Sequence, residues 1–140
     1  MPKQGYRWVY SPKKLSKPRV PAHVKLMVEK AALELVESVL KPKHIQAPPA
    51  PTEFQHNYVA DIYTKWYRHY FYFCAKYNCP GLNALFPSFE AKFARMEYVG
   101  GNGQFNLAFM RYTGEWVELY QGLSLAECLT AIEGESYFHP

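Results

Sequence analysis

The chain is poor in cysteine and contains no long apolar run. Its three cysteines, Cys74, Cys79 and Cys128, are an odd number at irregular spacing, which favours reduced thiols over a disulfide framework. No run of about 18 uncharged apolar residues occurs, and the N-terminal "MPKQGYRWVY" lacks the apolar core of a secretory signal. We therefore expect a soluble cytoplasmic protein that has no membrane partner.

The usual signatures of catalysis and cofactor binding are also missing. The sequence contains no G-x-S-x-G elbow, no Walker-type phosphate loop and no G-x-G-x-x-G fingerprint. The "GGNG" at 100–103 is more simply a hairpin turn, in which glycine supplies a positive φ. His69, Cys74 and Cys79 have no C-x-x-C knuckle beside them, so their spacing favours buried thiols over zinc. We expect no cofactor, no metal site and no catalytic residue.

Positive charge is concentrated at the start of the chain. Residues 1–44 carry ten Lys or Arg against three Glu, a net +7, whereas the remainder carries six against nine, a net −3. We interpret residues 1–21 as a basic, proline-containing arm and residues 22–140 as a single α+β domain with a Pro-rich connector at 42–53. The arm could dock on its own domain, anchored by Trp8, or on a polyanion.

An amphipathic helix is predicted to begin at Pro21, which suits the first helical position, and to end at Lys41, before Pro42. Its apolar stripe is wider than usual and is formed by Val24, Leu26, Val28, Ala31, Leu33, Leu35, Val36, Val39 and Leu40. Such a helix is either deeply seated or in contact with two partners.

The central segment, residues 54–77, fits either a helix or a β-hairpin. It includes "WYRHYFYFCAKY", with seven aromatic rings in twelve residues. A helix is favoured by a T-x-x-Q capping box at 52–55 and by polar residues that share one arc of the wheel. A hairpin is favoured because aromatic and β-branched side chains prefer pleated surfaces. We favour the hairpin, with the helix as the alternative.

The predicted hairpin joins strands at 57–67 and 70–77 by a turn at Arg68 and His69. In this register Tyr67 faces Tyr70, and Thr64 faces Phe73. The turn contains neither Asn nor Gly, which tight turns usually require.

Further strands are predicted at 88–99, 104–112 and 115–121. A two-residue turn at Thr113 and Gly114 would join the last two. The implied pairing sets Arg111 opposite Trp116, Phe109 opposite Glu118 and Leu107 opposite Tyr120. It also pairs Met110 with Val117 and Ala108 with Leu119.

A short C-terminal helix is marked by Ser124 and Glu127, which form a capping box, and is stopped by Gly134. The fold class is therefore α+β: an N-terminal helix, an antiparallel meander of four to five strands and a short C-terminal helix. Both sheet faces read as largely apolar, so we expect one helix to cover each face. If the N-terminal helix lies elsewhere, the uncovered face becomes a dimer or ligand surface.

The leading functional hypothesis is a non-catalytic module that binds a protein partner or forms a homodimer. It depends on the aromatic excess and the two-sided apolar sheet, because Tyr, Trp and Arg anchor protein interfaces. The predicted interface residues are Trp66, Phe105, Phe109, Arg111, Trp116, Glu118 and Tyr120.

The alternative hypothesis is single-stranded nucleic-acid binding, in which cations follow phosphates and rings stack on bases. The predicted contact residues are Arg7, Trp8, Lys13, Lys14, Lys17, Arg19, Lys65, Trp66 and Arg68. A third class, an enzyme, would require His69, Arg111 and Glu118 to converge in one pocket.

Overall fold

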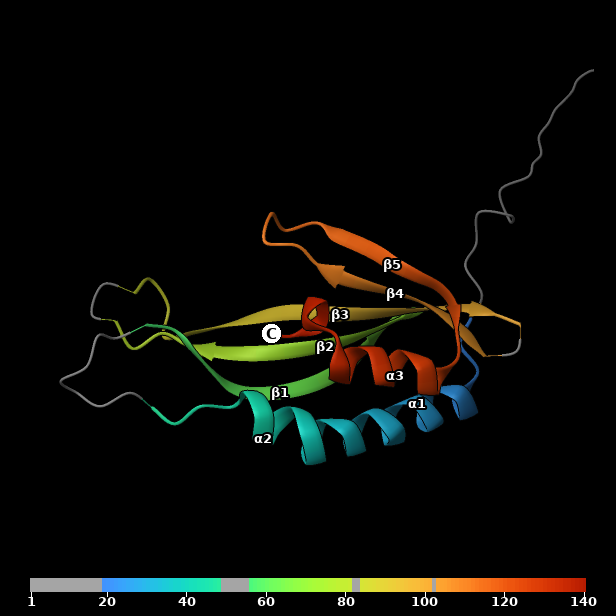
Figure 1. Cartoon of the computed structure of the whole chain (residues 1–140), viewed down its shortest axis with the longest axis horizontal. Coiled ribbons are helices and arrows are strands. Elements are labelled where there is room, and N and C mark those ends of the chain that lie inside the picture. The colour runs from blue at the N-terminus through green and yellow to red at the C-terminus, as the bar shows by residue number, and fades with distance from the viewer. Residues whose placement is uncertain (1–18, 49–55, 82–83, 102) are drawn as a thin grey trace, which may run out of the picture.

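A computed structural model describes residues 19–48, 56–81, 84–101 and 103–140, and in it one antiparallel sheet carries all the strands (Figure 1). The strands follow the chain in the order β1-β2-β3-β4-β5, so the predicted α+β meander is confirmed. The helical elements are α1 (Ala22–Leu35), a π-helical turn (Val36–Leu40), α2 (Lys41–His44), α3 (Leu125–Gly134) and a 3₁₀ turn (Ser136–Phe138). The strands are β1 (Tyr58–Tyr67), β2 (Tyr70–Asn78), β3 (Ser88–Gly100), β4 (Gln104–Met110) and β5 (Trp116–Leu123).

The central segment is a β-hairpin, and the alternative of a helix is wrong. Tyr67 pairs with Tyr70 and Thr64 with Phe73, as the predicted register requires. The tight turn forms although it contains neither Asn nor Gly, because Arg68 adopts a positive φ of 57°. For a non-glycine residue this left-handed conformation costs roughly 1–2 kcal/mol, which the long pairing of β1 with β2 offsets.

The N-terminal helix continues past Pro42, which corrects the predicted end at Lys41. A proline inside a helix lacks an N–H donor, and its ring clashes with the carbonyl four residues earlier. The preceding turn is widened here, since the Lys41 N–H bonds the Val36 carbonyl five residues back. This π-helical turn makes room for the proline ring, and the helix runs on to His44.

Both long helices lie against the same face of the sheet. The helix α1 contacts β1 and α3, while α3 contacts β4 and β5 (Figure 1). The expectation that α1 covers the second face is therefore wrong. The linear pattern contains nothing that decides the side on which a helix packs. We call the side under the helices the covered face and the opposite side the open face.

The core lies between the covered face and the helices. Phe71 and Phe73 of β2 are fully buried there, together with Phe105 of β4 and Phe138 of the 3₁₀ turn. The predicted capping box of α3 is present: the Ser124 Oγ accepts from the Glu127 N–H, and the Glu127 side chain accepts from the Ser124 N–H.

Single-residue bulges interrupt the ladder. In β1 a bulge lies between Val59 and Asp61, and in β3 one lies opposite the step from Phe73 to Cys74. A bulge places two residues against one on the neighbouring strand, so it shifts the alternation of side chains by one position.

The predicted register of β4 with β5 is only partly right. Leu107 does pair with Tyr120, but Trp116 pairs with Met110 and Glu118 with Ala108. The other predicted pairs of this hairpin are wrong: Arg111 with Trp116, Met110 with Val117, Phe109 with Glu118 and Ala108 with Leu119.

The predicted pairing is wrong near the loop because this loop is one residue longer than expected. The Arg111 N–H donates to the Glu115 carbonyl, which encloses three residues instead of two. Gly114, with φ 90°, supplies the left-handed residue of this three-residue loop. An irregularity between Leu107 and Ala108 then restores the predicted pairing beyond it.

Candidate functional site: the open face of the sheet

The open face carries rings and charges where the covered face carries apolar side chains. Because side chains alternate along a strand, the register places these residues together from four different strands. They are Tyr63, Lys65, Tyr67, Tyr70, Tyr72, Glu90, Lys92, Arg95, Trp116 and Glu118.

A stack of rings is built around Arg95 at the centre of this face. The Arg95 guanidinium carbon lies 4.6 Å from the ring centroid of Tyr70 and 4.9 Å from that of Trp116. The rings of Tyr72 and Trp116 are 5.8 Å apart. A guanidinium held over two rings gains about 0.5–1 kcal/mol or more from each, so the stack holds its residues in place. The Arg95 Nε is buried and makes no hydrogen bond within the described residues.

The Glu90 carboxylate forms ion pairs with the lysines beside the stack. Its carboxylate accepts from the Tyr63 hydroxyl, from the Lys65 Nζ at 2.9 and 3.0 Å and from the Lys92 Nζ at 3.3 Å. The Tyr63 hydrogen bond, followed by that of Lys65, lowers the pKa of Glu90 to about 2. Burial raises the pKa of the neighbouring Cys74 thiol to about 11, so this thiol is protonated and unreactive near neutral pH.

A shallow depression of about 370 Å³ opens between these groups. It is lined by Lys65, Tyr67, Tyr72 and Lys92 of the open face and, at the β1 edge of the sheet, by Trp66, whose ring packs on the covered side. The aromatic walls of this depression suit an aromatic side chain of a partner, because the two lysines are already paired with Glu90.

The proposed catalytic trio does not meet. His69 lies in the β1–β2 turn, where its Nε2 is 3.1 Å from the Glu97 Oε2 and both side chains are about nine-tenths buried. Arg111 begins the β4–β5 loop, and in an antiparallel meander the β1–β2 and β4–β5 connections lie at opposite ends of the sheet. The geometry therefore gives no support to an enzyme that uses His69, Arg111 and Glu118 together.

The residues predicted to contact nucleic acid are divided between separate places. Lys65 lies on the open face and Arg68 in the turn after it, but Trp66 lies on the covered face, with the Lys25 Nζ 5.8 Å from its ring. Arg19 is exposed at the start of the described structure. Arg7, Trp8, Lys13, Lys14 and Lys17 lie outside the described residues.

The predicted interface residues are divided in the same way. Trp116 and Glu118 lie on the open face, and Arg111 is exposed in the β4–β5 loop. Phe105, however, is fully buried.

Two further members of that set belong to the covered side. Phe109 packs against Phe138, and the Tyr120 hydroxyl donates to Glu135 of the segment after α3. The residue sets predicted for the interface and for nucleic-acid binding do not include Tyr70, Tyr72, Glu90, Lys92 or Arg95. The alternation of Tyr and Phe in "YFYF" was the signal that could have found the first two.

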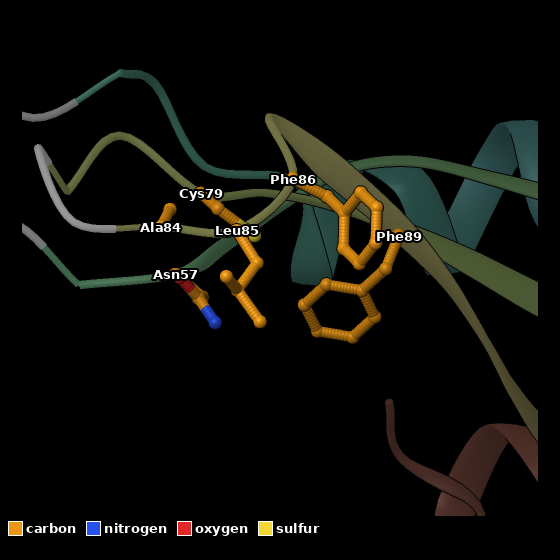
Figure 2. Close-up of a pocket in the computed structure, with 6 residues that line it drawn as sticks. All are labelled: Asn57, Cys79, Ala84, Leu85, Phe86 and Phe89. Atoms are coloured by element: carbon orange, nitrogen blue, oxygen red, sulfur yellow. The ribbon is translucent and has the colours of Figure 1, made fainter.

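A second depression, of about 280 Å³, lies in the β2–β3 loop (Figure 2). Leu85, Phe86 and Phe89 line it together with Cys79, and the Phe89 ring stacks on Tyr77 at 5.1 Å. Cys79 and His69 flank opposite ends of β2, so they cannot share a metal ion. Within the described ranges no group of three or more His, Cys, Asp or Glu could hold a metal.

Comparison with known sequences gives one family. No curated protein and no solved structure matches the chain. In the described part of the chain, no helix is long and apolar enough to cross a membrane. Residues 20–140, which include both helices and the whole sheet, match a family described as a domain of unknown function. The chain therefore belongs to the DUF3024 family.

Proposed function

We propose that the chain is a non-catalytic interaction module that binds a protein partner, or a second copy of itself, through the open face of its sheet. The observation that carries this proposal is the position of α1 and α3 on the same side of the sheet, so that no described helix covers the Arg95 stack. A surface of Tyr, Trp and Arg has the composition of interface hot spots.

The charge distribution on this face favours a protein over a nucleic acid. Lys65, Lys92 and Arg95 are interleaved with Glu90 and Glu118. The Glu90 carboxylate neutralises the two lysines nearest the depression. A phosphate backbone would be repelled by these carboxylates, whereas a protein surface of mixed charge can complement them.

A cytoplasmic location is part of the same proposal. It is supported by the cysteines, since Cys74, Cys79 and Cys128 are all unpaired thiols.

Site-specific photo-crosslinking tests the proposal. A benzophenone amino acid replaces Tyr67 on the open face in one variant and Leu33 on the outer side of α1 in the other. These two side chains are almost equally exposed, at 57% and 58%, so they form a matched pair. We expect protein adducts from position 67 that are lost when Trp116→Ala is added, and few adducts from position 33.

The mass of the adduct separates a homodimer from a different partner. Equal crosslinking from both positions, or crosslinking at position 67 that survives Trp116→Ala, would contradict the proposal. Crosslinking to a labelled single strand of nucleic acid in place of protein would contradict it as well.

A further inference from the structure

A groove between the edge strand β5 and the helix α3 is the largest of the depressions described here. Its volume is about 600 Å³. The small side chains of Ala126 and Ala131 line it beside Leu123 and Tyr120, so a bulky ring can approach closely. This groove lies apart from the open face, because Tyr120 and Leu123 belong to the covered side of the sheet.

Two carboxylates give the groove its charge. Glu135 accepts the Tyr120 hydroxyl at 2.8 and 2.9 Å, and Glu127 caps the start of α3. Each carboxylate has about four acceptor positions, so both can still accept from a cation. No lysine or arginine lines the groove among the described residues.

The two ends of the chain are opposite in charge. Residues 1–19 contain six Lys or Arg and no acidic residue, and they include the rings of Tyr6, Trp8 and Tyr10. Residues 112–140 contain five Glu and no Lys or Arg. The first segment therefore carries the positive charge that the groove lacks, together with large rings that can pack on its small side chains.

Residues 1–18 are joined to the described structure near the groove. The helices α1 and α3 contact each other and begin at the same end of the molecule (Figure 1). Trp8 stands eleven residues before Arg19, a length that spans up to about 36 Å when extended. The ten-residue helix α3 is only about 15 Å long. The chain is long enough for Trp8 to reach any part of the groove.

We infer that residues 1–18 bind the groove between β5 and α3 of their own chain, with Trp8 in contact with the small side chains and the lysines beside Glu127 and Glu135. The arm is then an internal ligand of a surface that the proposed function does not use.

Crosslinking within the full-length chain tests this inference. The photoreactive amino acid p-benzoylphenylalanine replaces Trp8, and the adduct is mapped by mass spectrometry. We expect crosslinks within one chain to residues 120–135, at a yield that does not depend on protein concentration. Adding Glu127→Gln together with Glu135→Gln should lower the yield by about fivefold, because two exposed ion pairs are lost. Glutamine keeps the cap of α3, so the fold is retained.

The matched control is Glu118→Gln, which removes one charge from β5, the strand that borders the groove, but on the open face. We expect it to leave the yield unchanged. Crosslinks that map to the open face, that form only between chains, or that are insensitive to the Glu127 and Glu135 changes would overturn the inference. None of these results would affect the separate crosslinking test at Tyr67.

Discussion

The two faces of the sheet differ most clearly along β2, where neighbouring residues of the same kind have opposite environments. Phe71 and Phe73 are fully buried on the covered face, while Tyr70 and Tyr72 are half-buried on the open face. The backbone is shared, and each pair of rings differs from the other by a hydroxyl group. An aromatic run in a strand is therefore two surfaces, and the hydroxyl indicates which of them meets water.

The two faces also hold their aromatic rings by different means. On the covered face, the rings of Phe71 and Phe73 meet edge to face at 5.5 Å and are enclosed by helices. On the open face, Arg95 lies between the rings of Tyr70 and Trp116. The covered face is stabilised by burial of apolar area, and the open face by a cation and its surrounding rings.

The largest expected difference is in stability. Phe71→Ala should lower the free energy of unfolding by about 3–5 kcal/mol, because it leaves a cavity in the core. Tyr72→Ala, one residue along, should cost only about 1 kcal/mol. Urea unfolding followed by circular dichroism measures both. Equal losses of stability would mean that the two faces are equally enclosed.

Adding a hydroxyl on the covered face, or removing one on the open face, should change the free energy of unfolding by a smaller amount. Phe73→Tyr should cost about 1–3 kcal/mol, because its hydroxyl would be buried without a partner. Tyr72→Phe on the open face should change the stability by less than about 0.5 kcal/mol. Thermal unfolding of the two variants provides the measurement. A costly Tyr72→Phe would show that the open face depends on that hydroxyl for its stability.

The smallest effect concerns pH and the open face alone. The pKa of Glu90 is lowered to about 2, so the stability that its ionised form contributes is present above its ordinary pKa and is lost as the pH falls towards 2. Wild-type protein should therefore lose about 1 kcal/mol more than Glu90→Gln between about pH 4.5 and pH 2, after allowance for solvent screening. Urea unfolding across this pH range measures the difference.

Glu118→Gln is the control for the pH experiment. Glu118 lies on the same face and accepts a hydrogen bond from Gln121, but it has no lysine partner among the described ion pairs. The substitution removes a carboxylate from the same face without breaking an ion pair, so it should change the free energy of unfolding at neutral pH by less than about 0.5 kcal/mol. If Glu90→Gln loses as much stability as the wild type between about pH 4.5 and pH 2, the cluster of Tyr63, Lys65 and Lys92 does not stabilise the fold.

Local pairing could be predicted from the sequence, and the placement of helices could not. The β1–β2 hairpin involves residues close together in the chain, so alternation and the short connection at Arg68 and His69 were enough to set its register. The side of the sheet on which α1 packs depends on contacts with β1 and α3 that no local pattern encodes. The one-residue error between β4 and β5 followed from a loop in which Gly114 permits either length.

The candidate site could not be predicted from the sequence, because it also depends on contacts between distant residues. Arg95 and Trp116 lie on strands that are not neighbours, and they meet only because β3, β4 and β5 are paired in order. Residues chosen for their type alone, such as Trp66 and Phe105, proved to belong to the covered face. Burial could be inferred from composition, but the choice of face required the register.

The bulges determine where the length of this chain can change. Deleting Ala60, the extra residue of the β1 bulge, would leave Val59 and Asp61 in regular alternation, so each face would keep its side chains. Deleting Ala75 from the regular part of β2 would turn one end of that strand over and would exchange core and surface residues. Single-residue deletions in relatives of this chain are therefore expected at the β1 bulge and not in the regular part of β2.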